Sequence, residues 1–288
     1  MSDSTNNEVR NGQIRTARIG DAATPIIELK DVDVTFKTRT GSLFHPNRIH
    51  AVRGVNMKVV AGETLGIVGE SGCGKSTTAN VMCGLQQPTA GHVFFKGVEV
   101  TKRSAKDRRR IGRVVSVVFQ DPATALNARM IVRDQLADPL NVHSIGTSAE
   151  RDKRVEDLIS MVGLPHSALD ALPGQLSGGQ RQRVAIARAL ALEPDAIIAD
   201  EPTSALDVSV RAQILNLLTD LKNELGLAMV FISHDIQTVR YVSDRIAVMH
   251  DGVVAEEGPG AQLLANPQDP YTQKLLGAAP SLLHPVLN

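Results

Sequence analysis

A glycine-rich segment in the first third of the chain has the residue types and the spacing of a phosphate-binding loop. Residues 69–77 fit the pattern G-x-x-x-x-G-K-[ST], between an apolar run at 64–68 that predicts a buried strand and a helical spacing at 78–86. Glycines let the backbone curl so that N–H groups point at phosphate oxygens, and the helix N-terminus adds partial positive charge. The segment therefore predicts binding of a nucleoside triphosphate. The residues expected to hold it are Gly69, Glu70, Ser71, Gly72, Cys73, Gly74, Lys75, Ser76 and Thr77.

Charged and hydroxyl side chains in two segments could act on the triphosphate. Lys75 is placed to reach the β- and γ-phosphates, and the Ser76 hydroxyl is placed to ligate Mg²⁺. Further along, an apolar run at 196–199 ends in Asp200 and Glu201. Asp200 at a strand end can hold Mg²⁺ directly or through water, and Glu201 suits polarising an attacking water. The alternative is that the pair only solvates the end of a strand.

A third segment predicts a helix start that could bind an anion. Residues 176–180 read LSGGQ, with Ser177 as the helix cap and two glycines that favour a close backbone approach. This geometry would be a second anion site, although the chain holds one nucleotide loop for it to serve. The residues of this segment are Leu176, Ser177, Gly178, Gly179 and Gln180.

Together with the phosphate loop, the LSGGQ segment makes the chain strongly resemble the ATP-binding subunit of an ABC transporter, a family whose signature motif is LSGGQ. The resemblance covers nearly the whole chain, from about residue 26 onwards. The matching features, in the order of that family, are the phosphate loop, Gln120, the signature, Asp200-Glu201, Ser204-Ala205-Leu206-Asp207 and His234.

The resemblance implies roles for residues that spacing alone does not assign. It implies that Gln120 contacts Mg²⁺ and the attacking water and senses the membrane partner, and that His234 contacts the γ-phosphate. Residues 204–207 resemble a loop that crosses to the opposite subunit. The implied catalytic residues are Lys75, Gln120, Glu201 and His234, and the implied Mg²⁺ ligands are Ser76, Gln120 and Asp200. The residues implied to face the partner's ATP are the five signature residues and Asp207.

One aromatic residue is a candidate for stacking on the adenine ring. Phe36 lies where the family places such an aromatic. It could equally be a half-buried strand residue, because the segment after it is unusually long and His50 could take its place. The sequence leaves the two readings open.

Two further segments resemble the branch of the family that imports oligopeptides, dipeptides and nickel. Residues 119–129 are similar to FQDP-x-x-SLNPR, with Ala125 and Ala128 as departures. Residues 266–276 are similar to the C-terminal NPxHPYTxxLL of that branch, with Asp269 in place of His. Some members carry an iron–sulfur cluster in that extension. This chain has no cysteine after position 83, so we expect it to ligate none.

The order of predicted elements indicates the fold that positions these residues. Strands are expected at 26–36, 51–60, 64–68, 93–100, 114–119, 196–199, 228–233 and 245–249, and helices at 78–86, 131–139, 148–162, 178–192, 208–225 and from 235. The alternation predicts an α/β protein with a mostly parallel sheet and its ligand at the carboxyl ends of the strands. The resemblance makes this a P-loop ABC ATPase fold with an antiparallel β part and an inserted helical subdomain.

The expected domain organisation follows from the same pass along the chain. Residues 1–24 are polar and aperiodic and predict a disordered tail. Residues 25–250 form the expected nucleotide-binding domain, with the helical subdomain at about 121–180. Residues 37–50 predict a surface loop because they contain Gly, Pro, Asn and basic residues. Residues 251–288 form the expected C-terminal extension.

Composition limits the classes of partner. Among the 288 residues, Lys plus Arg and Asp plus Glu both number 31, and Trp is absent. Zero formal net charge and few aromatics argue against nucleic acid or anionic lipid as the main partner. A basic run at 101–113 fits a solvated helix face better than a nucleic-acid patch. No run of consecutive apolar residues approaches the length of a membrane-spanning helix.

These observations predict an ATPase subunit that drives import of peptides or a similar small solute through a separate channel. The expected partners are a second ABC ATPase subunit, identical or a sister chain, two transmembrane permease subunits and an extracytoplasmic solute-binding protein, and no nucleic acid. The expected place is the cytoplasmic face of the membrane. The alternatives are an exporter subunit and a soluble ABC ATPase acting on nucleic acid or ribosomes. The latter predicts tandem ATP domains or a long coiled coil, which the chain lacks.

One further expectation concerns the thiol inside the phosphate loop. The loop N–H groups, the helix N-terminus and the Lys75 charge all favour a thiolate, so we expect a Cys73 pKa below that of a free thiol. Cys83 is expected to be buried in the following helix and unreactive.

Overall fold

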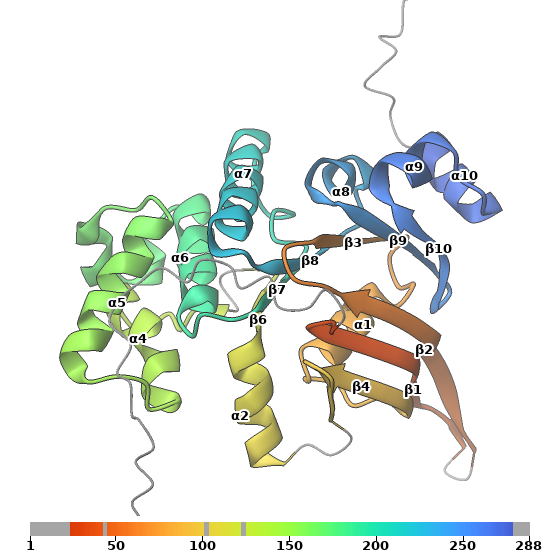
Figure 1. Cartoon of the computed structure of the whole chain (residues 1–288), viewed down its shortest axis with the longest axis horizontal. Coiled ribbons are helices and arrows are strands. Elements are labelled where there is room, and N and C mark those ends of the chain that lie inside the picture. Colours follow the sequence, from red (N-terminus) through yellow and green to blue (C-terminus); the bar gives the residue numbers. More distant parts are fainter. Residues whose placement is uncertain (1–23, 43–44, 101–103, 122–124, 279–288) are drawn as a thin grey trace, which may run out of the picture.

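The computed structural model describes residues 24–42, 45–100, 104–121 and 125–278, and contains two β-sheets with helices packed around them (Figure 1). Several expectations fall outside the described residues. These are the tail at 1–23, the start of the basic run at 101–103, part of the peptide-importer motif at 122–124, and the end of the extension at 279–288.

The larger sheet has six strands in the order β10-β9-β3-β8-β7-β6. Its strands are β3 (Thr64–Val68), β6 (Val115–Val118), β7 (Ala196–Asp200), β8 (Ala228–Ser233), β9 (Arg245–His250) and β10 (Val253–Pro259). Every pair is parallel except β9 with β10, which form an antiparallel hairpin around the turn at 251–252. The expected mostly parallel sheet is therefore present, and the carboxyl ends of β3, β6, β7 and β8 meet at one edge.

The smaller sheet is antiparallel, in the order β2-β1-β4-β5, with β1 (Ile27–Ser42), β2 (His45–Val59), β4 (Ala90–Phe95) and β5 (Val98–Glu99). The expected surface loop at 37–50 is wrong, because β1 and β2 continue through it and pair as far as Ser42 with His45. Proline within a sheet is confined mainly to edge strands, and β2, which contains Pro46, is at the edge of this sheet. Loop-type composition did not prevent strand pairing.

The central strands of the larger sheet are buried on both faces, which explains why β3, β7 and β8 read as continuous apolar runs. Along β8, Met229 and Phe231 belong to one core, and Val230 and Ile232 belong to the other. This alternation is the period of two expected of a strand. The first core lies under the helices of the middle of the chain, and the second lies between the two sheets. Two packed faces hold the strand ends rigidly, and the functional residues follow those ends.

Three helices form a group at the end of the molecule away from the small sheet (Figure 1). They are α4 (Val132–Val142), α5 (Ser148–Met161) and α6 (Gly178–Leu190), and short 3₁₀ turns at 166–170 and 173–175 join α5 to α6. Leu136, Leu158 and Val184, one from each helix, are fully buried in a shared core. The sequence predicted these three helices to within a few residues.

The remaining helices are α1 (Lys75–Met82), α2 (Ala105–Val114), α7 (Val208–Leu225), α8 (Ile236–Val242), α9 (Gly260–Ala265) and α10 (Pro270–Ala278). Helix α2 carries the rest of the basic run. It begins with a reciprocal cap between Ser104 and Asp107 and buries Ile111 and Val114, so its charged residues lie on the outer face. None of the described helices is long and apolar enough to cross a membrane.

Candidate nucleotide-binding site

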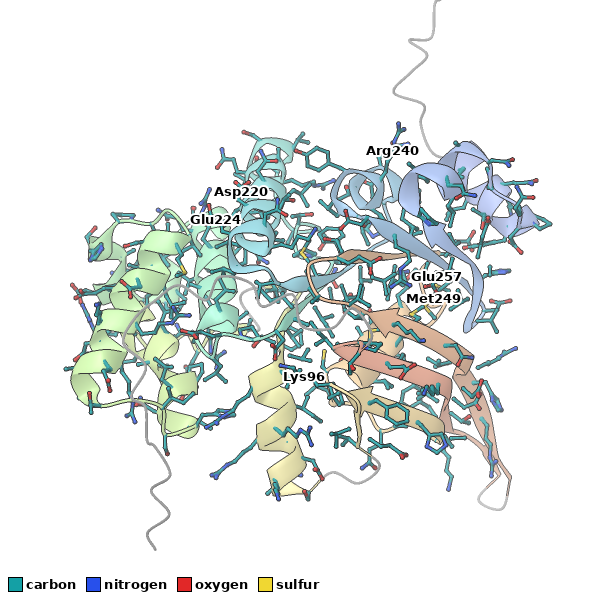
Figure 2. All side chains as sticks on the ribbon, in the orientation of Figure 1. Lys96, Asp220, Glu224, Arg240, Met249 and Glu257 are labelled. Atoms are coloured by element: carbon teal, nitrogen blue, oxygen red, sulfur yellow. The ribbon has the colours of Figure 1, made fainter. Side chains whose placement is uncertain are left out.

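The phosphate loop joins β3 to α1, and its glycines are required by the geometry. Gly69, Gly72 and Gly74 have φ values of 157°, 83° and 106°, a region that other residues rarely adopt. A Cβ atom on Gly74 would lie 2.3 Å from the Ala51 carbonyl oxygen, and one on Gly69 would lie 2.1 Å from that of Met249. The loop therefore lies closely between β2 and β9. Figure 2 labels Met249, on β9, next to the small sheet.

Helix α1 starts at Lys75, directly after the loop, whereas the sequence predicted a start near residue 78. Its N-cap is Gly74 in the left-handed conformation, and no side chain caps the first turn. The first N–H groups of a helix have no partner inside the helix. In α1 these free N–H groups lie at the concave side of the loop, where the positive end of the helix dipole also lies. Both favour the binding of phosphate.

Lys75 brings a buried positive charge to the loop. Its side chain is 6% exposed, and Nζ donates hydrogen bonds to the carbonyl oxygens of Gly69, at 2.7 Å, and Glu70, at 2.8 Å. The ammonium group thus lies inside the curve of the loop. Ser71, Ser76 and Thr77 lie in the same loop and first helical turn, as the sequence pattern places them.

The expected low pKa of Cys73 is wrong. The residue is buried between the loop and the second core, and this burial raises the pKa of its thiol above the ordinary value. The Lys75 ammonium, 3.9 Å from the sulfur, offsets only part of that cost. Cys83, at the C-cap of α1, is partly exposed rather than buried, yet desolvation and the charge of Asp200 raise the pKa of its thiol as well.

Asp200, the last residue of β7, lies against the start of α1. Ser76 Oγ lies 3.4 Å from Asp200 Oδ1. Burial raises the pKa of the Asp200 carboxyl, and Glu201 adds to this effect, while Ser76 and Lys75 oppose it. A hydroxyl and a carboxylate oxygen at this spacing are the hard oxygen donors that Mg²⁺ prefers, so this pair fits the metal.

Glu201 is held in an unusual backbone conformation and contacts His234. Its φ is 46°, in the left-handed region, and its N–H donates to the Ile232 carbonyl at 2.9 Å. Non-glycine residues kept in this region are frequent at functional sites. The carboxylate Oε1 lies 3.0 Å from His234 Nδ1; the Glu201 side chain is 19% exposed and that of His234 is 61% exposed. The two side chains therefore lie within hydrogen-bonding distance at the carboxyl ends of β7 and β8.

Gln120 lies at the same edge of the sheet. It is exposed and comes two residues after Val118, which pairs with Ala199 of β7, just as Glu201 comes two residues after Ala199. The parallel register therefore brings the ends of β6 and β7, which Gln120 and Glu201 follow, to the same edge of the sheet.

The structure does not decide between the two readings of Phe36. The residue is 40% exposed on β1 and pairs across the ladder with Ile49. His50 contacts Thr35 Oγ1 at 3.3 Å and directly precedes Ala51, whose carbonyl borders the phosphate loop. Phe36 as the adenine-stacking residue stays a prediction.

The signature segment starts α6 as the sequence predicted. Ser177 Oγ accepts a hydrogen bond from Gln180 N at 3.2 Å, and Gln180 Oε1 accepts one from Ser177 N at 2.8 Å. A Cβ on Gly179 would lie 2.6 Å from Val210 Cγ1, so this glycine lets α6 approach α7 closely. Leu176 is buried beneath the segment, while Ser177 is exposed.

Asp207, predicted together with the signature, caps α7. Its Oδ1 accepts from Val210 N at 3.0 Å, and its side chain lies on an exposed turn next to Val208, which is 81% exposed. Among the described residues, no hydrogen bond or ion pair joins 69–77 to 176–180. In Figure 1, α6 lies beside α4 and α5, whereas α1 lies beside the small sheet.

Sequence reasoning missed one contact of the phosphate loop. The hydroxyl of Tyr271, on α10, accepts a hydrogen bond from the backbone N–H of Glu70 at 3.1 Å. The two residues are 201 positions apart. No periodicity or local spacing could signal a contact over that distance, although Tyr271 lies in the segment that resembles the peptide-importer extension.

The fold and this site define an ABC-type ATPase, and comparison with known proteins gives the same class. The family model described as ABC transporter matches residues 52–204. The chain belongs to this family. Its structure is similar to the dimeric ATP-binding cassette MJ0796 in a post-hydrolysis state bound to ADP and Pi, with a TM-score of 0.71 and 35% identity over 81% of this chain and 98% of that one.

Particular relatives narrow the branch. The oligopeptide transport ATP-binding protein AppF of Bacillus subtilis is 47% identical over 258 residues, which cover 88% of this chain and 78% of that protein. OppF of Lactococcus lactis, named for the same function, is 43% identical over 89% of this chain and 81% of its own length. CbiO1 of Clostridium perfringens, part of the ABC transporter complex CbiONQ, has a TM-score of 0.73 at 30% identity and covers 84% of this chain and 92% of its own.

Proposed function

We propose that this chain is the ATP-hydrolysing subunit of an importer for peptides or a similar small solute. The observation that carries the proposal is the identity of 43–47%, over nearly nine tenths of the chain, to proteins named for oligopeptide transport. The arrangement of Lys75, Asp200 and Glu201 at one sheet edge supports ATP hydrolysis as its activity.

The residues at that edge suggest how hydrolysis proceeds. The loop N–H groups and the Lys75 ammonium hold the β- and γ-phosphates of ATP. Glu201 accepts a proton from a water whose oxygen attacks the γ-phosphorus, while the bond to the β-phosphate oxygen breaks and ADP leaves. His234, 3.0 Å from Glu201, positions that carboxylate. Mg²⁺, held by Ser76, Asp200 and Gln120, would supply neutralisation of phosphate charge.

The separation of the phosphate loop from the signature supports a site shared between two copies. Ser177 and Asp207 both lie exposed, and neither meets the loop of its own chain. We propose that the signature of one subunit covers the ATP held by the loop of the other. ATP then favours the closed pair because it contacts both faces, and hydrolysis removes the bridging γ-phosphate.

The proposal includes separate membrane subunits. Two permease subunits would form the channel, an extracytoplasmic protein would deliver the solute, and this chain would act on the cytoplasmic side. Gln120 would sense the channel, because it lies at the site edge and precedes the helical group. The helical group would pass the closing motion to the channel.

Reconstitution tests this function. The chain would be co-expressed with the permease subunits and solute-binding protein that co-purify with it, placed in liposomes, and supplied with ATP on its own side and a labelled pentapeptide on the other. We expect peptide accumulation on the ATP side, lost in a matched Lys75→Ala preparation. Accumulation in the opposite direction would indicate an exporter. ATPase activity stimulated several-fold by DNA or ribosomes, without any transport, would indicate a soluble ATPase.

A further inference from the structure

The start of helix α10 is fixed to the large sheet by hydrogen bonds from backbone N–H groups to a side-chain carboxylate. The Glu256 carboxylate, on β10, accepts from the N–H groups of Gln268, at 2.9 Å, and Asp269, at 3.1 Å. Asp269 Oδ1 in turn accepts from Tyr271 N at 2.8 Å and from Thr272 N at 3.2 Å, which caps the helix. Asp269, which departs from the family's His, thus has a clear local role. The result is a rigid mount for Tyr271.

The Tyr271 side chain uses both its ring and its hydroxyl. The ring stacks on His250, at the end of β9, with centroids 3.9 Å apart and planes 7° from parallel. The hydroxyl accepts the hydrogen bond from Glu70 N at 3.1 Å. Burial raises the pKa of the phenol above its ordinary value, which by itself already keeps the hydroxyl neutral at physiological pH.

Glu70 is held from both sides of its backbone. Its N–H is bound by Tyr271, and its carbonyl oxygen accepts from Lys75 Nζ at 2.8 Å. One residue therefore links the C-terminal helix to the ammonium group that we assign to the phosphates. The other end of the loop is bound to the β9–β10 hairpin, which also carries His250 and Glu256, because Gly252 N donates to the Cys73 carbonyl at 3.0 Å.

We propose that Tyr271 is a positioning residue for the phosphate loop, and that α10 is in this way part of the nucleotide site. Tyr271 fixes the orientation of the Glu70 backbone, and through it the curve in which Lys75 and the loop N–H groups meet a triphosphate. The inference rests on the proposed binding of ATP. Loop order helps substrate and transition state alike, so its loss raises KM and the dissociation constant rather than lowering kcat.

The first test removes one oxygen atom. Tyr271→Phe keeps the ring on His250 and deletes the acceptor for Glu70 N–H. We expect the dissociation constant for ATP and the KM to rise about 3–10-fold, the usual effect of losing one hydrogen bond, with kcat changed less than about twofold. Tyr241→Phe is the matched control, since Tyr241 is exposed and its hydroxyl donates to Asn216 at 2.8 Å on α7.

The outcomes are distinct. Equal ATP affinity in Tyr271→Phe and Tyr241→Phe overturns the inference, and so does a loss of kcat with KM unchanged. A wild-type protein that binds no ATP would instead contradict the proposed function. The melting temperatures of both variants, compared with wild type, separate a local effect from loss of folding.

A spectroscopic readout checks the contact without relying on turnover. The chain contains two tyrosines and no tryptophan, so in Tyr241→Phe all tyrosine emission comes from Tyr271. ADP or ATP should change this emission, because the loop that binds phosphate holds its hydroxyl. Tyr271→Phe, which keeps only Tyr241, corrects for light absorbed by the nucleotide. Identical titration curves for the two proteins would overturn the inference.

Discussion

The starts of helices α1 and α6 both offer backbone N–H groups to an anion, but they are built in different ways. Helix α1 begins after Gly74, in the left-handed conformation, and no side chain caps it. Helix α6 begins after Ser177, whose hydroxyl accepts from Gln180 N while the Gln180 side chain returns the bond. Since a capped helix start already has part of its hydrogen bonding satisfied, α1 depends on a ligand more than α6 does.

Their glycines differ in the same sense. In the phosphate loop, Gly69 and Gly74 have positive φ and lie against backbone carbonyls of β9 and β2. In the signature, Gly179 has an ordinary backbone conformation, and the space for its missing side chain is filled by Val210. The loop is shaped for a ligand by its own chain. The signature is shaped by packing on α7, and Ser177 in it is exposed.

The largest expected effect is on chemistry at the phosphate-loop side. Glu201→Gln keeps the size of the side chain but cannot accept the proton of the attacking water. We expect ATP binding to persist and hydrolysis to slow by about 10²–10⁴-fold, the usual loss of a general base. Single-turnover hydrolysis and equilibrium ATP binding measure the two effects separately. A variant that hydrolyses ATP at close to the wild-type rate would contradict the role given to Glu201.

The next effect is on affinity. Lys75→Ala removes the ammonium group from the loop, and we expect the dissociation constant for ATP to rise about 100-fold, as charge-assisted hydrogen bonds to phosphate are lost. Lys96→Ala is the control: Lys96, labelled in Figure 2, is half exposed and pairs with Asp195 at 2.8 Å. Calorimetric titration should show wild-type affinity for Lys96→Ala. Equal weakening in both variants would mean that the Lys75 charge acts only through the field of the whole protein.

A smaller effect distinguishes the two signature glycines. Gly179→Ala forces a methyl group toward Val210, at 2.6 Å, whereas at Gly178 the nearest atom, Leu206 Cδ2, is at an ordinary 3.5 Å. Overpacking of this kind costs about 1–3 kcal/mol, so the melting temperature of Gly179→Ala should fall by several degrees. Gly178→Ala should melt within about a degree of wild type, because a substitution whose added methyl group meets no close atom changes the free energy of unfolding little. Equal melting of the two variants would show that α6 and α7 can separate freely.

The smallest effect concerns the loop thiol. Because burial raises the pKa of Cys73, its thiolate is scarcer at neutral pH than that of a free thiol. We expect N-ethylmaleimide to label Cys73 slowly at pH 7 and faster through the alkaline range, to inactivate the ATPase, and to be blocked by Mg-ATP. Mass spectrometry of the labelled peptides at several pH values measures this. Labelling at pH 7 as fast as a free cysteine, or Cys83 reacting first, would contradict it.

Much of the fold was predictable because local patterns agree with the tertiary structure. Helix α7 and strand β8 were predicted to the residue. A long run of apolar residues at helical spacing marks α7, and a short continuous apolar run marks β8, so neither assignment is ambiguous. The outer part of the β1–β2 hairpin, at residues 37–50, was not, because its glycine, proline and basic residues are typical of a loop. Only pairing with the neighbouring strand, a non-local effect, makes them strand.

The site divides in the same way. Residues that belong to a short motif could be located from the spacing of that motif, such as Lys75 in the phosphate loop and Ser177 in the signature. Their local geometry follows from the same spacing. The Cys73 pKa could not, because the charge of Lys75 is visible in the sequence while the burial that outweighs it is not. The Tyr271 contact with Glu70 depends on where α10 docks, which no local pattern records.

The claim that two copies share each ATP is tested most directly by ATP-dependent dimerisation. Sedimentation velocity would compare Glu201→Gln with Glu201→Gln/Ser177→Arg, each with and without Mg-ATP, after ATP affinity has been measured for both. The account predicts that ATP converts the first protein to a dimer, and that the second binds ATP equally well but stays monomeric, because the arginine blocks the exposed face of α6. Dimerisation of both proteins to the same extent would contradict the account.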